Sequence, residues 1–131
     1  MTKHTAKFVG IAISALIGTV AWAGAKNTNT VLVNTVARTA SGSLGDARNT
    51  ADTQQFIGCG ITTYVGSAPT VACFAMDTSS NYVGCSSTNA DLLATAQSIN
   101  GDSYITFTWD AFSGCTSLSV TNASLGAPKQ P

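Results

Sequence analysis

Three of the four cysteines lie within residues 56–85, a segment that alternates with the period of β-strands and contains two turns. The first turn, at 64–69, is centred near Gly66, and the second, at 77–81, is rich in residues that bond their own backbone. We therefore predict a meander of short antiparallel strands at 54–63, 70–76 and 82–85. The predicted cross-strand pairs are Ile61 with Val71, Cys59 with Cys73, Gly58 with Phe74, and Ile57 with Ala75.

The first 25 residues have the organisation of a secretory signal peptide. Lys3 and Lys7 make the start basic, an apolar run covers 8–22, and small residues fitting an Ala-x-Ala rule precede position 26. The apolar run is shorter than the ~20 residues that span a bilayer. We expect residues 1–25 to be removed on export to the periplasm or the extracellular space, and the mature chain not to insert into a membrane.

Removal of the leader leaves a restricted set of ionisable side chains. The only histidine, His4, lies in the leader, and the chain contains no glutamate. Four basic and six acidic residues remain after position 25, a formal charge of −2. Such a chain cannot build a Ser-His-Asp centre or a histidine metal site, and it has no basic patch for phosphates. We expect a non-enzyme without cofactors and without nucleic-acid partners.

The cysteines predict covalent cross-links. About 106 residues remain after the leader, which is enough for one domain with a small hydrophobic core. An even cysteine count in an exported chain indicates two disulfides, and the spacing does not match a zinc site, so we expect no metal. A helix predicted at 88–99 leads the chain away from Cys85, and the next strand returns it toward Cys115. This favours Cys85 with Cys115 and Cys59 with Cys73, although Cys73 with Cys85 stays open.

Residues 26–53 divide into a strand and a loop. Residues 30–37 are β-prone, and we predict a strand buried on both sides, with Val31 and Val33 on one face and Leu32 and Val36 on the other. Residues 38–53 hold one large apolar side chain and two glycines, which indicates a flexible loop or a frayed helical turn. The strand can pair within its own sheet, or it can insert into a neighbouring subunit by strand addition.

The C-terminal part contains a helix and a hairpin. Residues 88–99 start at a Thr88–Asp91 cap and carry an apolar stripe. Alternation at 103–109 and 115–120 places Ile105 opposite Val120 and Phe107 opposite Leu118. We predict an α+β fold, mainly antiparallel β with about five or six short strands, one helix near 88–99 and two disulfides. The disulfide-linked β-rich domain covers 54–124, and 125–131 form a tail.

Three side chains are candidate surface contacts. Arg38 and Arg48 flank a glycine- and serine-rich segment and can hold an anion, or they can pair with Asp46 or Asp52. Phe112 lies in the last turn and is the aromatic expected at the surface, whereas Trp109 is expected in the core. Asp46 and Asp52 could bind calcium, and solvated loop charges are the alternative.

Four short runs carry a resemblance: Ala40–Asn49, Ile57–Cys59, Cys85–Ser87 and Asp102–Ile105. With these runs the chain resembles a group of small exported bacterial proteins of uncharacterised function, which implies export and nothing about activity. We predict an exported, non-enzymatic structural or interaction protein, such as a surface filament subunit that assembles by addition of the N-terminal strand. The alternative is a periplasmic or secreted binding module or enzyme inhibitor that acts through loops and an aromatic patch. The expected partner is a protein, either a second copy or another exported protein.

Overall fold

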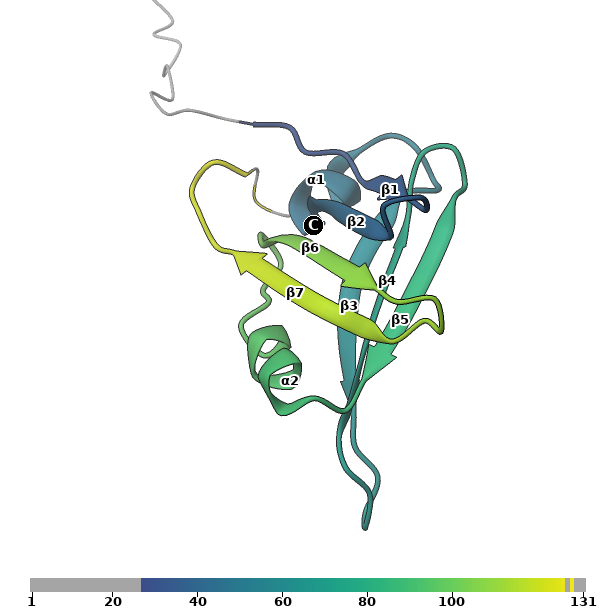
Figure 1. The fold of residues 1–131 in the computed structure, drawn as a ribbon. Coiled ribbons are helices and arrows are strands. Elements are labelled where there is room, and N and C mark those ends of the chain that lie inside the picture. Colours follow the sequence, from purple (N-terminus) through teal and green to yellow (C-terminus); the bar gives the residue numbers. More distant parts are fainter. Residues whose placement is uncertain (1–26, 127, 129–131) are drawn as a thin grey trace, which may run out of the picture.

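Seven strands and two short helices form two antiparallel sheets (Figure 1). The computed structural model describes residues 27–126 and 128, so the predicted signal peptide lies outside the described residues. The elements are β1 Leu32–Asn34, β2 Thr39–Ser43, α1 Leu44–Asn49, β3 Phe56–Thr62, β4 Thr70–Met76, β5 Tyr82–Ser87, α2 Ala90–Ala96, β6 Tyr104–Trp109 and β7 Cys115–Thr121. The predicted α+β class, mainly antiparallel β with two disulfides, is confirmed, with seven strands rather than five or six and a second helix.

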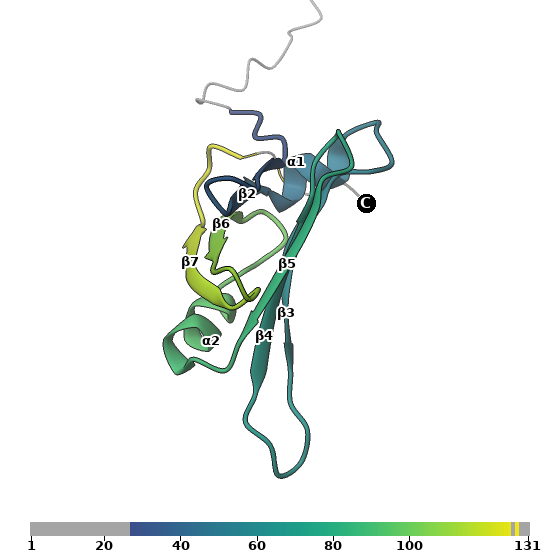
Figure 2. The same cartoon turned by 45° about the vertical axis from the view of Figure 1, so that its right-hand side comes forward.

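One sheet has the strand order β1-β2-β6-β7 and the other β3-β4-β5. Figure 2 shows the β3-β4-β5 sheet nearly edge-on, with β6, β7 and α2 all on one side of it. The core lies between the sheets, and its buried side chains include Val31, Ala40, Ile57, Val71, Ala75, Ile105 and Phe107. The opposite face of the β3-β4-β5 sheet, which we call the outer face, is not covered by another sheet or helix of the described chain.

The meander forms in the predicted register. Strand β3 pairs with β4 without interruption from Phe56 opposite Met76 to Thr62 opposite Thr70. The ring of Phe74 lies 3.6 Å from the position that a Cβ on Gly58 would take, so the aromatic covers the bare backbone of the glycine. In the last hairpin, the pairs Ile105 with Val120 and Phe107 with Leu118 are also confirmed.

Residues 38–53 do not form a flexible loop, and the alternative prediction of a helical turn holds for Leu44–Asn49. They contain β2, which lies between β1 and β6 inside a sheet, and α1. Small residues are needed in β2, because a Cβ on Gly42 would lie 3.1 Å from the Cα of Val31. The helix begins where the Ser43 hydroxyl accepts a hydrogen bond from the Asp46 N–H, at 3.2 Å. The segment that looked like a loop therefore packs as part of the body.

The N-terminal strand is shorter and more exposed than predicted. Only Leu32–Asn34 are in β1, which lies at a sheet edge and pairs with β2. Val31 is 2 % exposed, but Leu32 is 65 % and Val36 is 95 % exposed, so the prediction of burial on both sides was wrong. The reason is that an edge strand over one core buries one face only, and the chain turns away after Asn34.

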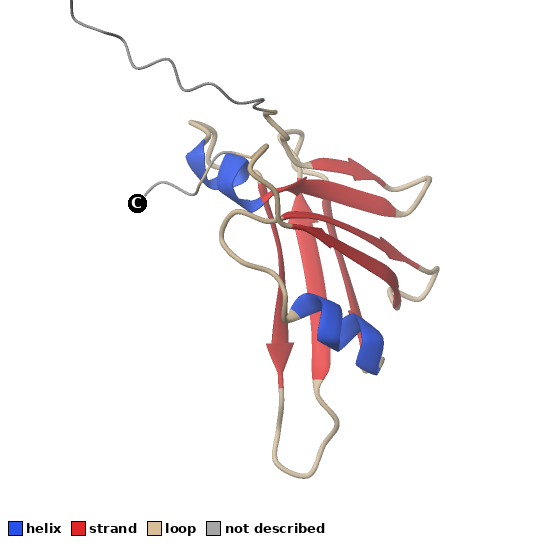
Figure 3. Ribbon diagram, turned by 90° about the vertical axis from the view of Figure 1, so that its left-hand side faces the viewer, coloured by secondary structure: helices blue, strands red, loops and turns tan. Residues whose placement is uncertain are grey.

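Helix α2 is shorter than the helix predicted near 88–99, and its cap lies one residue later. Its N-cap is Asn89 rather than Thr88, and the Asn89 side-chain oxygen accepts hydrogen bonds from the N–H groups of Asp91 and Leu92. The helix ends at Ala96, although Ile99 beyond it also packs against the core. Figure 3 shows α2 across the lower part of the β3-β4-β5 sheet, with the β3-β4 hairpin extending below it.

Both favoured disulfides are present. Cys59–Cys73 links neighbouring strands β3 and β4, and Cys85–Cys115 links β5 to β7 and therefore joins the two sheets. Near the second bond, the Ser86 N–H donates to the Ser113 carbonyl at 3.0 Å, and Ser86 forms a parallel bridge with Gly114. The turn between β6 and β7 is thereby attached to the edge of β5.

Candidate functional site

The β3-β4-β5 sheet is almost free of charge. Between residues 56 and 90 the only charged residue is Asp77, in the turn after β4. Strands β3 and β5 are the two edges of this sheet. Proteins usually protect such edges with charged side chains, prolines or bulges, because an open edge is a template for another strand. Neither edge strand carries a charge or a proline, so neither edge has this kind of protection.

Strand β5 is covered along part of its edge only. The Ser86 N–H points away from β4 to Ser113, and backbone groups alternate along a strand. The N–H and C=O groups of Gly84 and Tyr82 therefore point to the same open side. No strand of the described chain lies beside β5 on that side. This leaves a short length of β-strand edge available to a ligand backbone.

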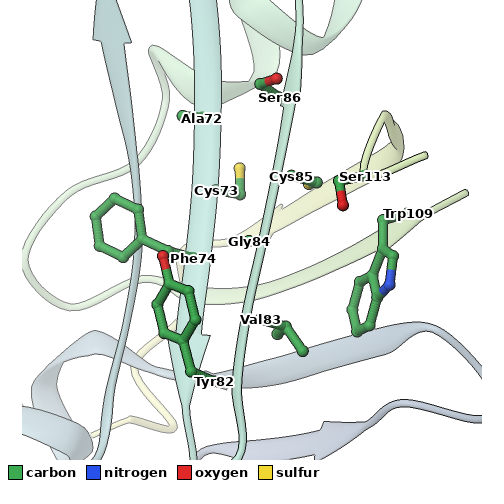
Figure 4. Close-up of a pocket in the computed structure, with 10 residues that line it drawn as sticks. All are labelled: Ala72, Cys73, Phe74, Tyr82, Val83, Gly84, Cys85, Ser86, Trp109 and Ser113. Atoms are coloured by element: carbon green, nitrogen blue, oxygen red, sulfur yellow. The ribbon is translucent and has the colours of Figure 1, made fainter. Parts of the chain in front are cut away.

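A groove of about 580 Å³ follows this open edge, and we call it the β5 groove. Figure 4 shows Phe74 and Tyr82 on one side of β5 and Trp109 on the other, with Val83 beside Trp109. Gly84 contributes no side chain at the centre. The volume falls within the roughly 300–1,000 Å³ of ligand sites, and the lining is uncharged. The remaining lining residues are Ala72, Cys73, Cys85, Ser86 and Ser113.

An aromatic cluster on the outer face supports one wall of the groove. The ring of Phe56 lies 6.1 Å from that of Phe74 and 6.2 Å from that of Tyr82, measured between centroids. Such tilted and edge-on contacts are the favourable geometries for aromatic pairs. The three rings stay partly exposed, so they form an apolar surface rather than a closed core.

The turn at 77–81 sets where Tyr82 begins. The Asp77 carboxylate accepts hydrogen bonds from the N–H groups of Ser79 and Asn81 and from the Asn81 amide, all within 3.0 Å. The Asn81 side chain is the main cause of a pKa of Asp77 below its ordinary value of 3.8, and partial burial opposes the shift. The ionised carboxylate therefore stabilises the turn that starts β5.

We expect the free energy of unfolding to fall in acid, in part through Asp77. A lowered folded-state pKa means that the unfolded chain binds more protons, so this stability is present above pH 3.8 and is lost as the pH falls through the folded-state pKa. Urea denaturation at about pH 7 and about pH 3 measures the loss. Asp77→Asn should be less stable than wild type at the higher pH and lose less on acidification; an equal loss in both proteins would contradict the assignment.

The β3-β4 hairpin presents a second apolar surface. At its tip, which we define as residues 61–67, Tyr64 is 73 % exposed and Val65 is fully exposed. The Ser67 N–H donates to the Tyr64 carbonyl at 3.0 Å, and Gly66 has a φ of +83°. These features form a tight turn with Val65 at its apex, and the turn uses glycine where the backbone is left-handed. The Cys59–Cys73 disulfide links the two strands at the middle of their paired length.

The predicted arginine pair is not brought together. Arg38 lies in the turn before β2, and its carbonyl accepts a hydrogen bond from the Trp109 N–H. The pKa of Asp110 is lowered chiefly by hydrogen bonds from the Gly114 and Phe112 N–H groups, and the charge of Arg38 adds a smaller contribution. Arg48 lies at the other end of β2, in the last turn of α1, and lines a separate pocket of about 380 Å³ with Asp52. The structure thus offers no shared anion site for these two side chains.

Asp46 and Asp52 have structural tasks. Asp46 accepts from the Asn29 N–H at 2.8 Å. Asp52 accepts from the N–H groups of Gln54 and Gln55, from the Gln55 amide and from the Thr50 hydroxyl. These hydrogen bonds, chiefly that from the Gln55 backbone, hold the pKa of Asp52 well below its usual range. Both carboxylates therefore hold the backbone around them in place.

Phe112 is 93 % exposed in the β6-β7 turn, as expected of a surface contact, but it does not line the β5 groove. Trp109 is partly buried and lines it, so this side chain was missed as a site residue. Of the predicted assembly strand, Val31 is in the core and Leu32, Val33 and Asn34 pair within their own sheet, which is the alternative to strand donation.

Among residues 27–126 and 128 there is no cluster of three or more histidine, cysteine or acidic side chains placed to hold a metal ion. No helix in these ranges has the length and apolar character needed to cross a bilayer. Comparison with known proteins found no matching protein family, no matching curated protein and no matching solved structure. The geometry of the β5 groove and the hairpin tip is therefore the basis for a functional proposal.

Proposed function

We propose that this chain is an exported, non-enzymatic interaction protein that binds an extended segment of a partner protein along the β5 groove. The observation that carries the proposal is the open backbone of Tyr82 and Gly84 at the centre of an uncharged groove with apolar walls. Export is supported by the leader-like residues 1–25 and by two disulfides, which are typical of oxidising compartments.

Strand addition is the mode of binding that these groups suit. An extended segment next to an open strand edge gains main-chain hydrogen bonds, and pockets on alternate sides select its side chains. Here Tyr82 and Phe74 lie on one side of β5 and Trp109 on the other (Figure 4). Gly84 adds no side chain of its own to the groove, and the Tyr82 ring lies over it, with the Tyr82 hydroxyl 3.3 Å from the position that a Cβ would take. The segment should be apolar, because the groove has no charged lining to satisfy an ion.

A random-peptide phage library tests the proposal. We expect enrichment of uncharged, apolar sequences, and we expect their binding to fall by roughly tenfold or more in Gly84→Val, which places a side chain in the groove. Gly84 does not have a positive φ, so valine is compatible with the strand backbone. Val36→Asp, at an exposed site that does not line the groove, is the matched control and should bind as wild type does.

A second readout locates the peptide. Amide hydrogen exchange at Gly84 and Tyr82 should slow in the complex, because these N–H groups become hydrogen-bonded to the ligand. Absence of any enrichment, or peptides that bind wild type and Gly84→Val equally, would refute the groove as a peptide site. A folded variant is verified by its near-ultraviolet circular dichroism before binding is compared.

A further inference from the structure

We propose that the partner segment is the hairpin tip of a second copy of this chain, so that copies join head to tail. The inference rests on the proposed function of the β5 groove and adds the identity of its occupant. It uses two surfaces of one sheet: the exposed tip at residues 61–67 and the groove at Tyr82–Ser86. The tip supplies an apolar projection, and the groove supplies the cavity.

The hairpin tip exposes large apolar side chains to solvent. Ile61, Tyr64 and Val65 are all exposed, at the end of a hairpin that extends past the rest of the body (Figures 1 and 3). Large apolar side chains grouped on one projection mark interaction surfaces. The turn bond from Ser67 to Tyr64 and the disulfide below it hold this projection in place, so docking costs little ordering of the tip.

The two surfaces match in charge and in backbone requirements. Residues 56–76, which form the whole hairpin, contain no charged side chain, and neither does the groove lining. When the tip enters the groove, no charged side chain therefore loses its hydration. The chain just before the turn, at 63–64, follows Thr62, the last paired residue of β3, in a non-helical course, and it can lie beside the open edge at Tyr82 and Gly84.

A chain cannot fill its own groove with its own tip. Ser87, the last residue of β5, pairs with Val71, so the tip lies beyond the end of β5 and points away from the groove. The contact must then form between copies, and it joins two different surfaces. Such a heterologous contact leaves one tip and one groove free in every pair, so further copies add to both ends. The expected product is a filament or a ring, as an exported structural protein would form.

Sedimentation of the purified protein over a range of concentrations tests the inference. Wild type should form species larger than dimers as concentration rises. Val65→Asp at the turn apex and Tyr82→Ala in the groove should each weaken association by roughly 10- to 100-fold, because each removes a buried apolar contact. Val36→Asp is the matched control: valine there is about as exposed as at the apex but lies on the β1-β2 turn, and the variant should assemble normally.

Mixing gives the sharpest outcome. Val65→Asp keeps an intact groove and Tyr82→Ala keeps an intact tip, so an equal mixture should form one-to-one dimers that do not grow. A wild-type protein that stays monomeric, or that stops at a dimer, overturns the inference, as does equal assembly of Val65→Asp and Val36→Asp. A different result would refute the proposed function itself: Val65→Asp, whose groove is intact, would then bind no library peptide. Peptide binding by a wild-type protein that remains a monomer would retain the groove and reject the second copy.

Discussion

Replacing Phe107 by alanine is expected to lower the free energy of unfolding by about 3–5 kcal/mol. Phe107 is 0 % exposed and lies in β6, between β2 and β7, where it is opposite Ala40 and Leu118. Its ring contacts Trp109 at 5.9 Å between centroids. Alanine would leave a cavity that the surrounding strands cannot close, because their spacing is set by backbone hydrogen bonds. Urea denaturation at neutral pH measures the change.

Phe112→Ala is the matched control for this prediction. It removes the same side chain from a turn where the ring is exposed, so stability should change by no more than about 0.5 kcal/mol. A comparable loss in both variants would mean that the aromatic at 112 also contributes to the core. The pair therefore tests which face of the last hairpin is buried.

The hairpins could be predicted because their information is local. In β3 and β4, apolar side chains alternate around a turn whose centre is marked by Gly66, so one register satisfies both strands. The same reasoning predicted Phe107 opposite Leu118. The disulfide pairing followed from the direction of the chain, since a helix and a returning strand bring residue 115 back toward Cys85.

Strand β2 and helix α1 could not be predicted in this way, because their stability comes from tertiary contacts. Thr39–Ser43 has only small side chains, and these resemble a loop. Their small size is a packing requirement, since Gly42 lies against the backbone of Val31. Helix α1 has six residues, too few to be stable alone, and it depends on the Ser43 cap and its contacts with β2 and β3.

The β5 groove has no local signature, because it joins residues that are far apart in sequence. Trp109 reaches the edge of β5 only because Cys115 and Ser113 attach the last turn to that strand. Two signals in the sequence could have been used to find it. Gly84 interrupts a strand, which is typical of close backbone approach, and the long uncharged stretch around it lacks the charges that protect edges.

Removing the Cys85–Cys115 disulfide is expected to lower the free energy of unfolding by about 3–4 kcal/mol, from the chain entropy of a 30-residue separation. The double variant Cys85→Ala with Cys115→Ala tests it. This bond also joins the two sheets, so its loss should separate Trp109 from β5 before global unfolding. Trp109 is the only tryptophan after residue 25, and quenching of its fluorescence by acrylamide should increase in the folded variant.

Cys59→Ala with Cys73→Ala is the comparison that isolates the role of the sheet junction. This bond closes a shorter separation of 14 residues between strands that are already paired, so the loss should be about 3 kcal/mol and Trp109 quenching should not change. Equal quenching in the two double variants would show that the β5 groove holds its shape without the junction. An increase confined to the Cys85–Cys115 variant would show that a covalent bond between the sheets maintains the groove, and that variant should then also lose the binding of library peptides.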